Sequence, residues 1–83
     1  MRLLKEVPHQ RYKIQIFSYN EKYMVKIELG DYEQTYKIGA TNVDGLEDVE
    51  NMITETLLSS ALKRFVEMRA DWENCFKEKN NRV

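Results

Sequence analysis

The chain has 83 residues, a formal net charge of -1, 42% hydrophobic residues and 33% charged residues. This length is typical of one domain with a core so small that oligomerisation is a common further source of stability. The composition is globular and excludes a disordered chain. The nearly neutral charge removes the usual electrostatic basis for binding nucleic acid or an anionic membrane. We therefore treat residues 1–83 as a single domain.

The N-terminal segment and the single cysteine bear on localisation. Leu3 and Leu4 are followed at once by charged residues, so residues 1–7 are typical of neither a signal peptide nor a membrane span. Cys75 is the only cysteine and cannot form a disulfide within the chain, which favours a reducing compartment. The sequence predicts a cytoplasmic protein with no membrane contact.

Residues 1–10 allow two interpretations. Leu3, Leu4 and Val7 are compatible with a short strand or with a helical turn packed on the domain, and Pro8 ends either element. Residues 11–18, 22–29 and 32–38 are clearer, because apolar and polar side chains alternate there with period two. The sequence therefore predicts three strands.

Two short turns connect these strands. Asn20 and Glu21 form the natural first turn, and Gly30 with the residue after it forms the second. Placing Tyr19 opposite Lys22 and Leu29 opposite Tyr32 brings the apolar partners of these strands onto one face. The apolar pairs on that face are Ile16 with Val25, Ile14 with Ile27, Val25 with Tyr36, and Tyr23 with Ile38. The two turns agree, so we predict an antiparallel meander.

The opposite face of the predicted sheet is polar. Lys13 lies opposite Glu28 in the predicted register, and one apolar pair, Phe17 and Met24, lies near the first turn. Four tyrosines share the apolar face instead, where core packing with hydroxyl groups at the rim is the favoured role over stacking on nucleic-acid bases. They are Tyr12, Tyr23, Tyr32 and Tyr36.

Residues 44–79 are predicted to be helical. No glycine or proline occurs from Leu46 onward, and strong helix formers fill most positions. Asp44 and Glu47 have the spacing of a capping box, while Lys77 and Lys79 lie where the helix dipole favours cations. The sequence predicts one long helix, or two helices in near-direct succession, followed by a frayed tail over residues 80–83. The fold class is α+β.

The helical region carries two apolar stripes. At about 100° per residue, the first forms one face suited to packing on a core. It comprises Leu46, Val49, Ile53, Leu57 and Ala61. The second advances in steps of four and three, the spacing of a seam between two helices. It comprises Leu58, Leu62, Phe65, Arg69, Trp72 and Phe76.

The second stripe exceeds what the sheet can cover. A helix of about 33 residues would reach roughly 50 Å, whereas a seven-residue strand spans about 23 Å. Either the chain bends near Ser59 and Ser60 and folds back as a helical hairpin, or a second chain covers the remainder. Because serines are weak helix breakers and a hairpin needs a connection of a few residues, we favour a homodimer. All six residues of the second stripe are the predicted interface. Two roles are open to Arg69 there: stacking on an aromatic ring, or pairing across the seam with Asp71 or Glu73.

Catalytic and metal-binding chemistry is not indicated. His9 and Cys75 fall in segments predicted to lie apart, and a cysteine among large apolar residues is ordinarily a buried structural thiol. The acidic group near the helix start is explained by capping and by the helix dipole, and its spacing fits no metal site. This group comprises Asp44, Glu47, Asp48 and Glu50. We predict a protein that is not an enzyme and holds no cofactor or metal.

The predicted function is that of a non-catalytic interaction or assembly module whose partner is a second copy or another protein. The alternative is a small nucleic-acid-associated regulator using Arg11, Lys13, Lys26 and Lys37 around Phe17 on the outer face of the sheet. The net charge argues against nucleic acid as the main partner. A third possibility is a small-ligand binder with tyrosine hydroxyl groups converging in a pocket between sheet and helix.

The predicted order of three strands and a helix, over about residues 11–65, is similar in topology to the repeat unit of Pur-alpha-type single-strand binders, which associate in pairs. The chain departs from that family in three respects. One strand is missing, the exposed face rich in glycine and arginine is absent, and no motif matches residue by residue. We therefore assign no family and transfer no residue roles.

Overall fold

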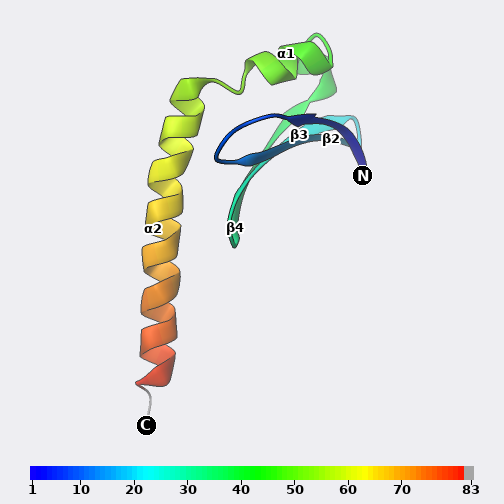
Figure 1. Ribbon diagram of the computed structural model, residues 1–83. Coiled ribbons are helices and arrows are strands. Elements are labelled where there is room, and N and C mark those ends of the chain that lie inside the picture. Colours follow the sequence, from blue (N-terminus) through cyan, green and yellow to red (C-terminus); the bar gives the residue numbers. More distant parts are fainter. Residues whose placement is uncertain (82–83) are drawn as a thin grey trace.

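The computed structural model describes residues 1–81 and contains one four-stranded antiparallel sheet with strand order β1-β2-β3-β4. The strands are β1 (Arg2–Val7), β2 (Lys13–Tyr19), β3 (Lys22–Leu29) and β4 (Tyr32–Gly39). A short 3-10 turn, η1 (Ala40–Asn42), leads to helix α1 (Leu46–Asn51) and the long helix α2 (Glu55–Asn80). Figure 1 shows α1 over the sheet and α2 beside it, with the C-terminal end of α2 far from every strand. The predicted α+β class is confirmed.

The predicted meander has the expected register. Tyr19 pairs with Lys22, and Leu29 pairs with Tyr32, so the apolar pairs of β2, β3 and β4 share one face. Asn20 and Glu21 have positive φ angles of 50° and 60°. Two positive φ angles are what a type I′ turn requires, and the twist of that turn matches the twist of the flanking strands.

The prediction of three strands is wrong, because residues 2–7 add a fourth. β1 pairs antiparallel with β2, and Val7 lies opposite Ile14. The register shifts between Leu3 and Lys5, which marks a bulge at Leu4. A bulge inserts an extra residue and breaks the period-two pattern. The alternation by which the other strands were predicted is therefore absent from β1.

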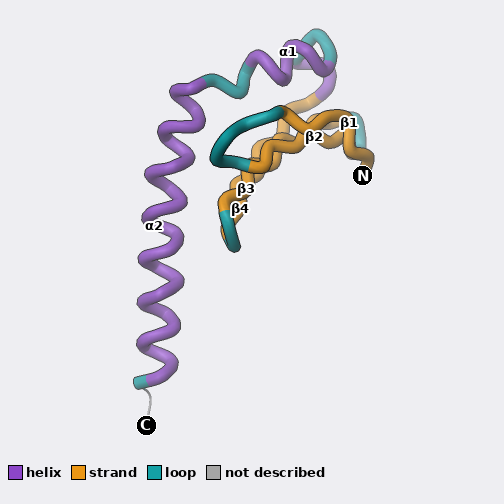
Figure 2. The backbone as a smooth tube through the Cα atoms, in the orientation of Figure 1, coloured by secondary structure: helices purple, strands orange, loops and turns teal. Residues whose placement is uncertain are grey.

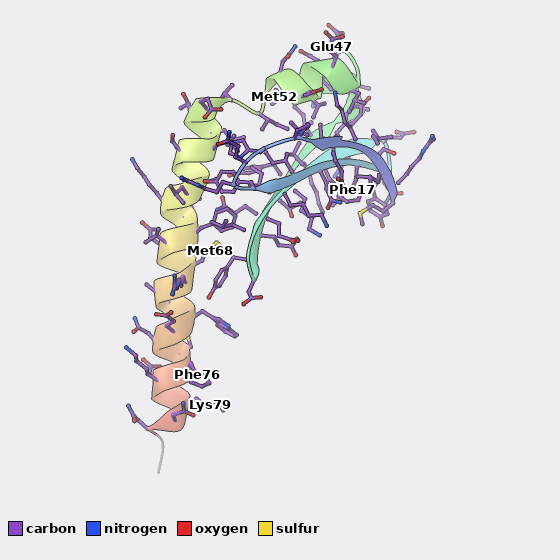
Figure 3. The ribbon with its side chains drawn as sticks, in the orientation of Figure 1. Phe17, Glu47, Met52, Met68, Phe76 and Lys79 are labelled. Atoms are coloured by element: carbon purple, nitrogen blue, oxygen red, sulfur yellow. The ribbon has the colours of Figure 1, made fainter. Side chains whose placement is uncertain are left out.

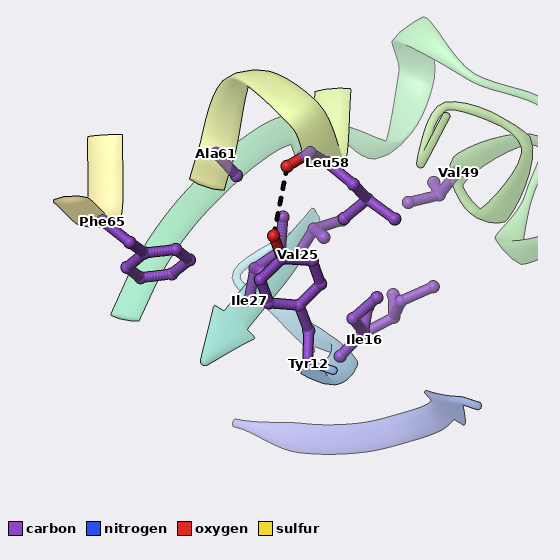
Figure 4. Close-up of a cluster of buried hydrophobic side chains, with 9 residues drawn as sticks. Tyr12, Ile16, Val25, Ile27, Val49, Leu58, Ala61 and Phe65 are labelled. Carbon is purple, nitrogen blue, oxygen red and sulfur yellow. Dashed lines mark hydrogen bonds between the residues drawn. The ribbon is translucent and has the colours of Figure 1, made fainter. Parts of the chain in front are cut away.

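Nine buried residues form the core between the inner face of the sheet and the two helices (Figure 4). They are Tyr12, Ile14, Ile16, Val25, Ile27, Val49, Leu58, Ala61 and Phe65. The Tyr12 hydroxyl group donates a hydrogen bond of 3.4 Å to the Leu58 carbonyl oxygen, and its ring lies 6.0 Å from that of Phe65. Tyr12, which directly precedes β2, thereby joins this strand to the first half of α2.

The helical region consists of two successive helices, one of the two predicted arrangements, and the break does not lie near Ser59 and Ser60. Residues 52–54 separate α1 from α2, and α2 continues unbroken through Ser59 and Ser60. Thr54 begins α2 as its N-cap, with its Oγ1 accepting a 3.1 Å hydrogen bond from the Leu57 N–H. A side-chain oxygen at this position satisfies a backbone N–H that has no partner within the helix. The folded-back helical hairpin is therefore not formed.

The predicted cap at Asp44 is also wrong. Gly45 occupies the N-cap of α1 with φ 87°, and no side chain caps that helix. Glycine adopts this φ without the steric cost that a Cβ atom brings. Asp44 and Asp48 do interact, but Asp44 is the donor. Its backbone N–H donates a 3.0 Å hydrogen bond to the Asp48 carboxylate.

Helix α2 is longer than the surface available to cover it. Its 26 residues extend roughly 39 Å at the usual rise, whereas the longest strands have 8 residues and span about 27 Å. Every residue from 71 to 80 is exposed. Figure 2 shows this part of α2 continuing past the sheet, and the described residues measure 54 × 26 × 18 Å. The predicted tail over 80–83 lies partly outside the described residues, and Asn80 is helical.

Candidate interaction surface

The predicted interface residues fall into two groups along α2. Leu58 and Phe65 have exposed fractions of only 5% and 3% and belong to the core of the protomer itself. Leu62 is partly buried and packs against that core. The sheet lies opposite this half of the helix, so these residues have intramolecular partners. They cannot supply much new contact area to a second chain without rearrangement.

Trp72 and Phe76 form the second group, and neither is covered by the protomer. Their exposed fractions are 68% and 62%. At about 100° per residue, both project within about 20° of the direction of Phe65, so they continue the stripe that is buried earlier in the same helix. We call residues 69–80 the free end of α2; Figure 3 shows Phe76 and Lys79 on it.

Arg69 begins the free end and is paired within its own helix. Its Nε lies 3.1 Å from the Glu73 Oε1, an i,i+4 ion pair whose two side chains are more than half exposed. The pairing with Glu73 that the sequence suggested across an interface is therefore satisfied inside one helix. Such exposed pairs contribute little to stability, about 0.3–0.5 kcal/mol.

The structure also contains a groove that the sequence did not predict. It has a volume of about 250 Å³ and lies between β4, α1 and the start of α2. Its lining is largely apolar and comprises Val25, Tyr36, Lys37, Ile38, Val49, Met52, Ile53 and Leu57. Met52, in the break between the helices, is 50% exposed. We call this the β4–α1 groove. No sequence signal indicated it, because the groove depends on where the helical region breaks.

Hydrogen bonds between β4 and α2 set the direction of the helix beside this groove. The Gln34 side chain donates to the Ala61 carbonyl oxygen at 2.8 Å. Arg64 donates to the Tyr36 hydroxyl oxygen at 2.9 Å, and the Tyr36 hydroxyl group donates to the Gln34 Oε1 at 3.3 Å. These contacts tie α2 to the edge strand, so the direction of the free end follows from the packing of the first half.

The outer face of the sheet carries a second, smaller apolar row. Phe17 lies opposite Met24 as predicted, and β1 adds Leu3 on the other side of Phe17. Among the cations proposed for nucleic-acid binding, Lys26 lies 3.1 Å from Glu33 and 3.9 Å from Glu28. Neighbouring carboxylates therefore reduce the attraction of this face for phosphate groups.

His9 and Cys75, the two candidate catalytic groups, lie in different surroundings. The His9 Nδ1 accepts hydrogen bonds from the backbone N–H groups of Arg11 at 3.1 Å and Tyr12 at 3.3 Å, so the imidazole organises the loop before β2. Cys75 is exposed on the free end, and the expectation of a buried thiol is wrong because nothing in the protomer covers that part of α2. Within residues 1–81, no group of three or more His, Cys, Asp or Glu side chains is placed to hold a metal ion.

Comparison with known proteins supplies no further constraint on function. No family model, curated protein or solved structure matches the chain. None of the helices in the described part of the chain has the length and apolar character needed to cross a membrane. Function must therefore be inferred from the exposed surfaces of the protomer.

Proposed function

We propose that the protein is a non-catalytic interaction module that assembles as a homodimer through the free end of α2. The observation that carries this proposal is the exposure of Trp72, 68%, on the helix face where Phe65 is 3% exposed. Contiguous exposed apolar surface on a small protein marks an interaction site, and Trp is enriched in the residues that dominate interfaces.

The energetics of the free end support a modest interaction that needs additional area. An aromatic side chain buries about 150–250 Å². The exposed parts of Trp72 and Phe76 in two copies therefore amount to about 500 Å², or roughly 13 kcal/mol of gross apolar burial at about 25 cal/mol per Å². The cost of association is about 4–15 kcal/mol. A stable dimer must therefore bury further surface beside these rings.

Dilution of the protein provides the test. We expect light scattering to give a mass of twice the protomer's 10.0 kDa at high concentration and to approach 10.0 kDa on dilution. Trp72 is the only tryptophan, so its fluorescence reports the same transition, and its emission should shift to longer wavelength as the indole returns to water. Trp72→Ala should weaken dimerisation by at least about 30-fold, equivalent to about 2 kcal/mol.

Tyr19→Ala is the matched control, because Tyr19 is also an exposed aromatic residue, at 48%, but lies at the β2–β3 turn. This variant should dimerise like the unmodified protein. A mass of 10.0 kDa at every concentration, or a Trp72→Ala variant with an unchanged mass profile, would contradict the proposed function.

A further inference from the structure

The geometry points to one docking site for the free end: we infer that it lies in the β4–α1 groove of a second copy, with the two α2 helices antiparallel and the exchange reciprocal. This inference rests on the proposed homodimer and specifies which surfaces meet. It combines two exposed apolar features of the described residues, the free end of α2 and the β4–α1 groove.

Cys75 and Asp71 of the free end lie on the same flank of α2 as the groove, and Trp72 projects about 60° from that direction. Leu57 lines the groove, and Cys75 follows eighteen residues later, a separation of about five turns that returns to the same direction. Met68, Trp72 and Cys75 line a depression of about 490 Å³ beside the start of β4, on this same flank. Val66, by contrast, projects from the opposite flank at about 180° from Leu57 and Cys75.

A second copy is the occupant because both surfaces are on one chain and complement each other under two-fold symmetry. An antiparallel pair centred at the level of residue 66 places Leu57 of each protomer beside the partner's Cys75. Both free ends then lie over the partner's groove, and the interface closes without leaving an open surface for a third chain. A parallel pair would bring the two free ends together and leave both grooves empty.

Charge complementarity supports the antiparallel arrangement. Arg64 and Asp71 lie on this flank seven residues apart, which separates them by about 10 Å along one helix, too far for an ion pair. None of the ion pairs of residues 1–81 includes either of them. In the antiparallel dimer, Arg64 of each protomer lies within about one helical turn of the partner's Asp71, so two opposite-charge contacts form.

The groove also supplies the additional area that the aromatic rings require. Met52 is half exposed at the groove, and the surrounding lining is apolar, so docking a helix there covers both copies' Met52 together with Trp72 and Phe76. Specific interfaces bury about 1,200–2,000 Å² in total. The rings alone reach roughly a third of this area, and the two grooves provide the matching surface.

Cysteine cross-linking tests the contact directly. The variant Leu57→Cys, which retains Cys75, is treated with a short bismaleimide, and we expect a covalent dimer on a denaturing gel. The unmodified protein should give none, because two Cys75 thiols in an antiparallel pair are separated by roughly 27 Å along the helices. The variant Val66→Cys with Cys75→Ser reports on the opposite flank and should also give none.

Charge reversal provides a second measurement that does not depend on the groove variant. We expect Arg64→Glu and Asp71→Arg each to weaken dimerisation at least tenfold, and the double variant to recover most of the loss. Arg64→Glu also removes the hydrogen bond from Arg64 to the Tyr36 hydroxyl oxygen, so Tyr36→Phe is its control and should dimerise like the unmodified protein. Two results would overturn the groove contact and leave the homodimer intact. One is a cross-link through Val66→Cys without one through Leu57→Cys. The other is a double variant that dimerises no better than the single variants. A protein of 10.0 kDa at all concentrations would instead overturn the proposed function itself.

Discussion

Each half of α2 has a phenylalanine on the same stripe, but one is buried and the other is exposed. Phe65 is 3% exposed and stacks against Tyr12 in the core, whereas Phe76 is 62% exposed eleven residues later. Eleven residues are about three turns, so both rings project from nearly the same side of the helix. The difference arises from what lies opposite each ring: the sheet for Phe65, and no part of the described protomer for Phe76.

The largest loss of stability is expected when the buried ring of Phe65 is removed. Phe65→Ala should lower the free energy of unfolding by about 3–5 kcal/mol, because it removes a buried aromatic ring and leaves a cavity. The loss should be the same at every protein concentration when measured by urea denaturation. Phe76→Ala is the matched variant and should change the stability of the dilute monomer by less than about 0.5 kcal/mol. Equal losses in the two variants would show that the free end is part of the protomer's core.

An intermediate effect is expected where α2 begins. Thr54→Ala should lower the free energy of unfolding by about 1 kcal/mol, because the Leu57 N–H loses the oxygen that it binds at 3.1 Å. Thr56 is exposed two residues later and caps no helix, so Thr56→Ala is the control for the loss of a threonine side chain. If the two variants unfold at the same urea concentration, the helix does not start at Thr54.

The smallest change in stability is expected at Arg69, where the covered half of α2 meets its free end. Arg69→Gln removes the exposed pair with Glu73 and should change the thermal stability of the dilute protein by less than about 0.5 kcal/mol. Circular dichroism during heating measures this change. Light scattering of the same variant tests whether Arg69 belongs to the interface. A marked loss of dimer would place Arg69 there together with Trp72, as the second stripe predicts.

The sequence predicted much of the fold for identifiable reasons. Tyr19 and Lys22 flank a two-residue turn, and only one register then puts Ile16 and Val25 on the same face, so the meander followed from local spacing. β1 was ambiguous because its bulge near Leu4 hides the alternation. The capping threonine, Thr54, is a recognisable signal in the sequence, but the run of helix formers around it left one long helix and two successive helices equally compatible with the sequence.

The proposed interaction surface was only partly predictable. Trp72 and Phe76 were correctly placed on the stripe that contains Phe65, because helical periodicity depends only on spacing. The assignment of Leu58 and Phe65 to the same surface did not anticipate that both are buried in the protomer. The β4–α1 groove had no sequence signal, since Met52 and Val25 are distant in the chain and meet only around the helix break.

Local spacing was enough to predict the strands β2 to β4, their register and the apolar stripe of α2, because these depend on local backbone geometry. Which of those side chains are covered follows from tertiary packing and could not be read from spacing. Burial depends on how far the sheet extends opposite the helix and on where the chain breaks between α1 and α2. The same stripe is therefore core at Phe65 and exposed surface at Trp72.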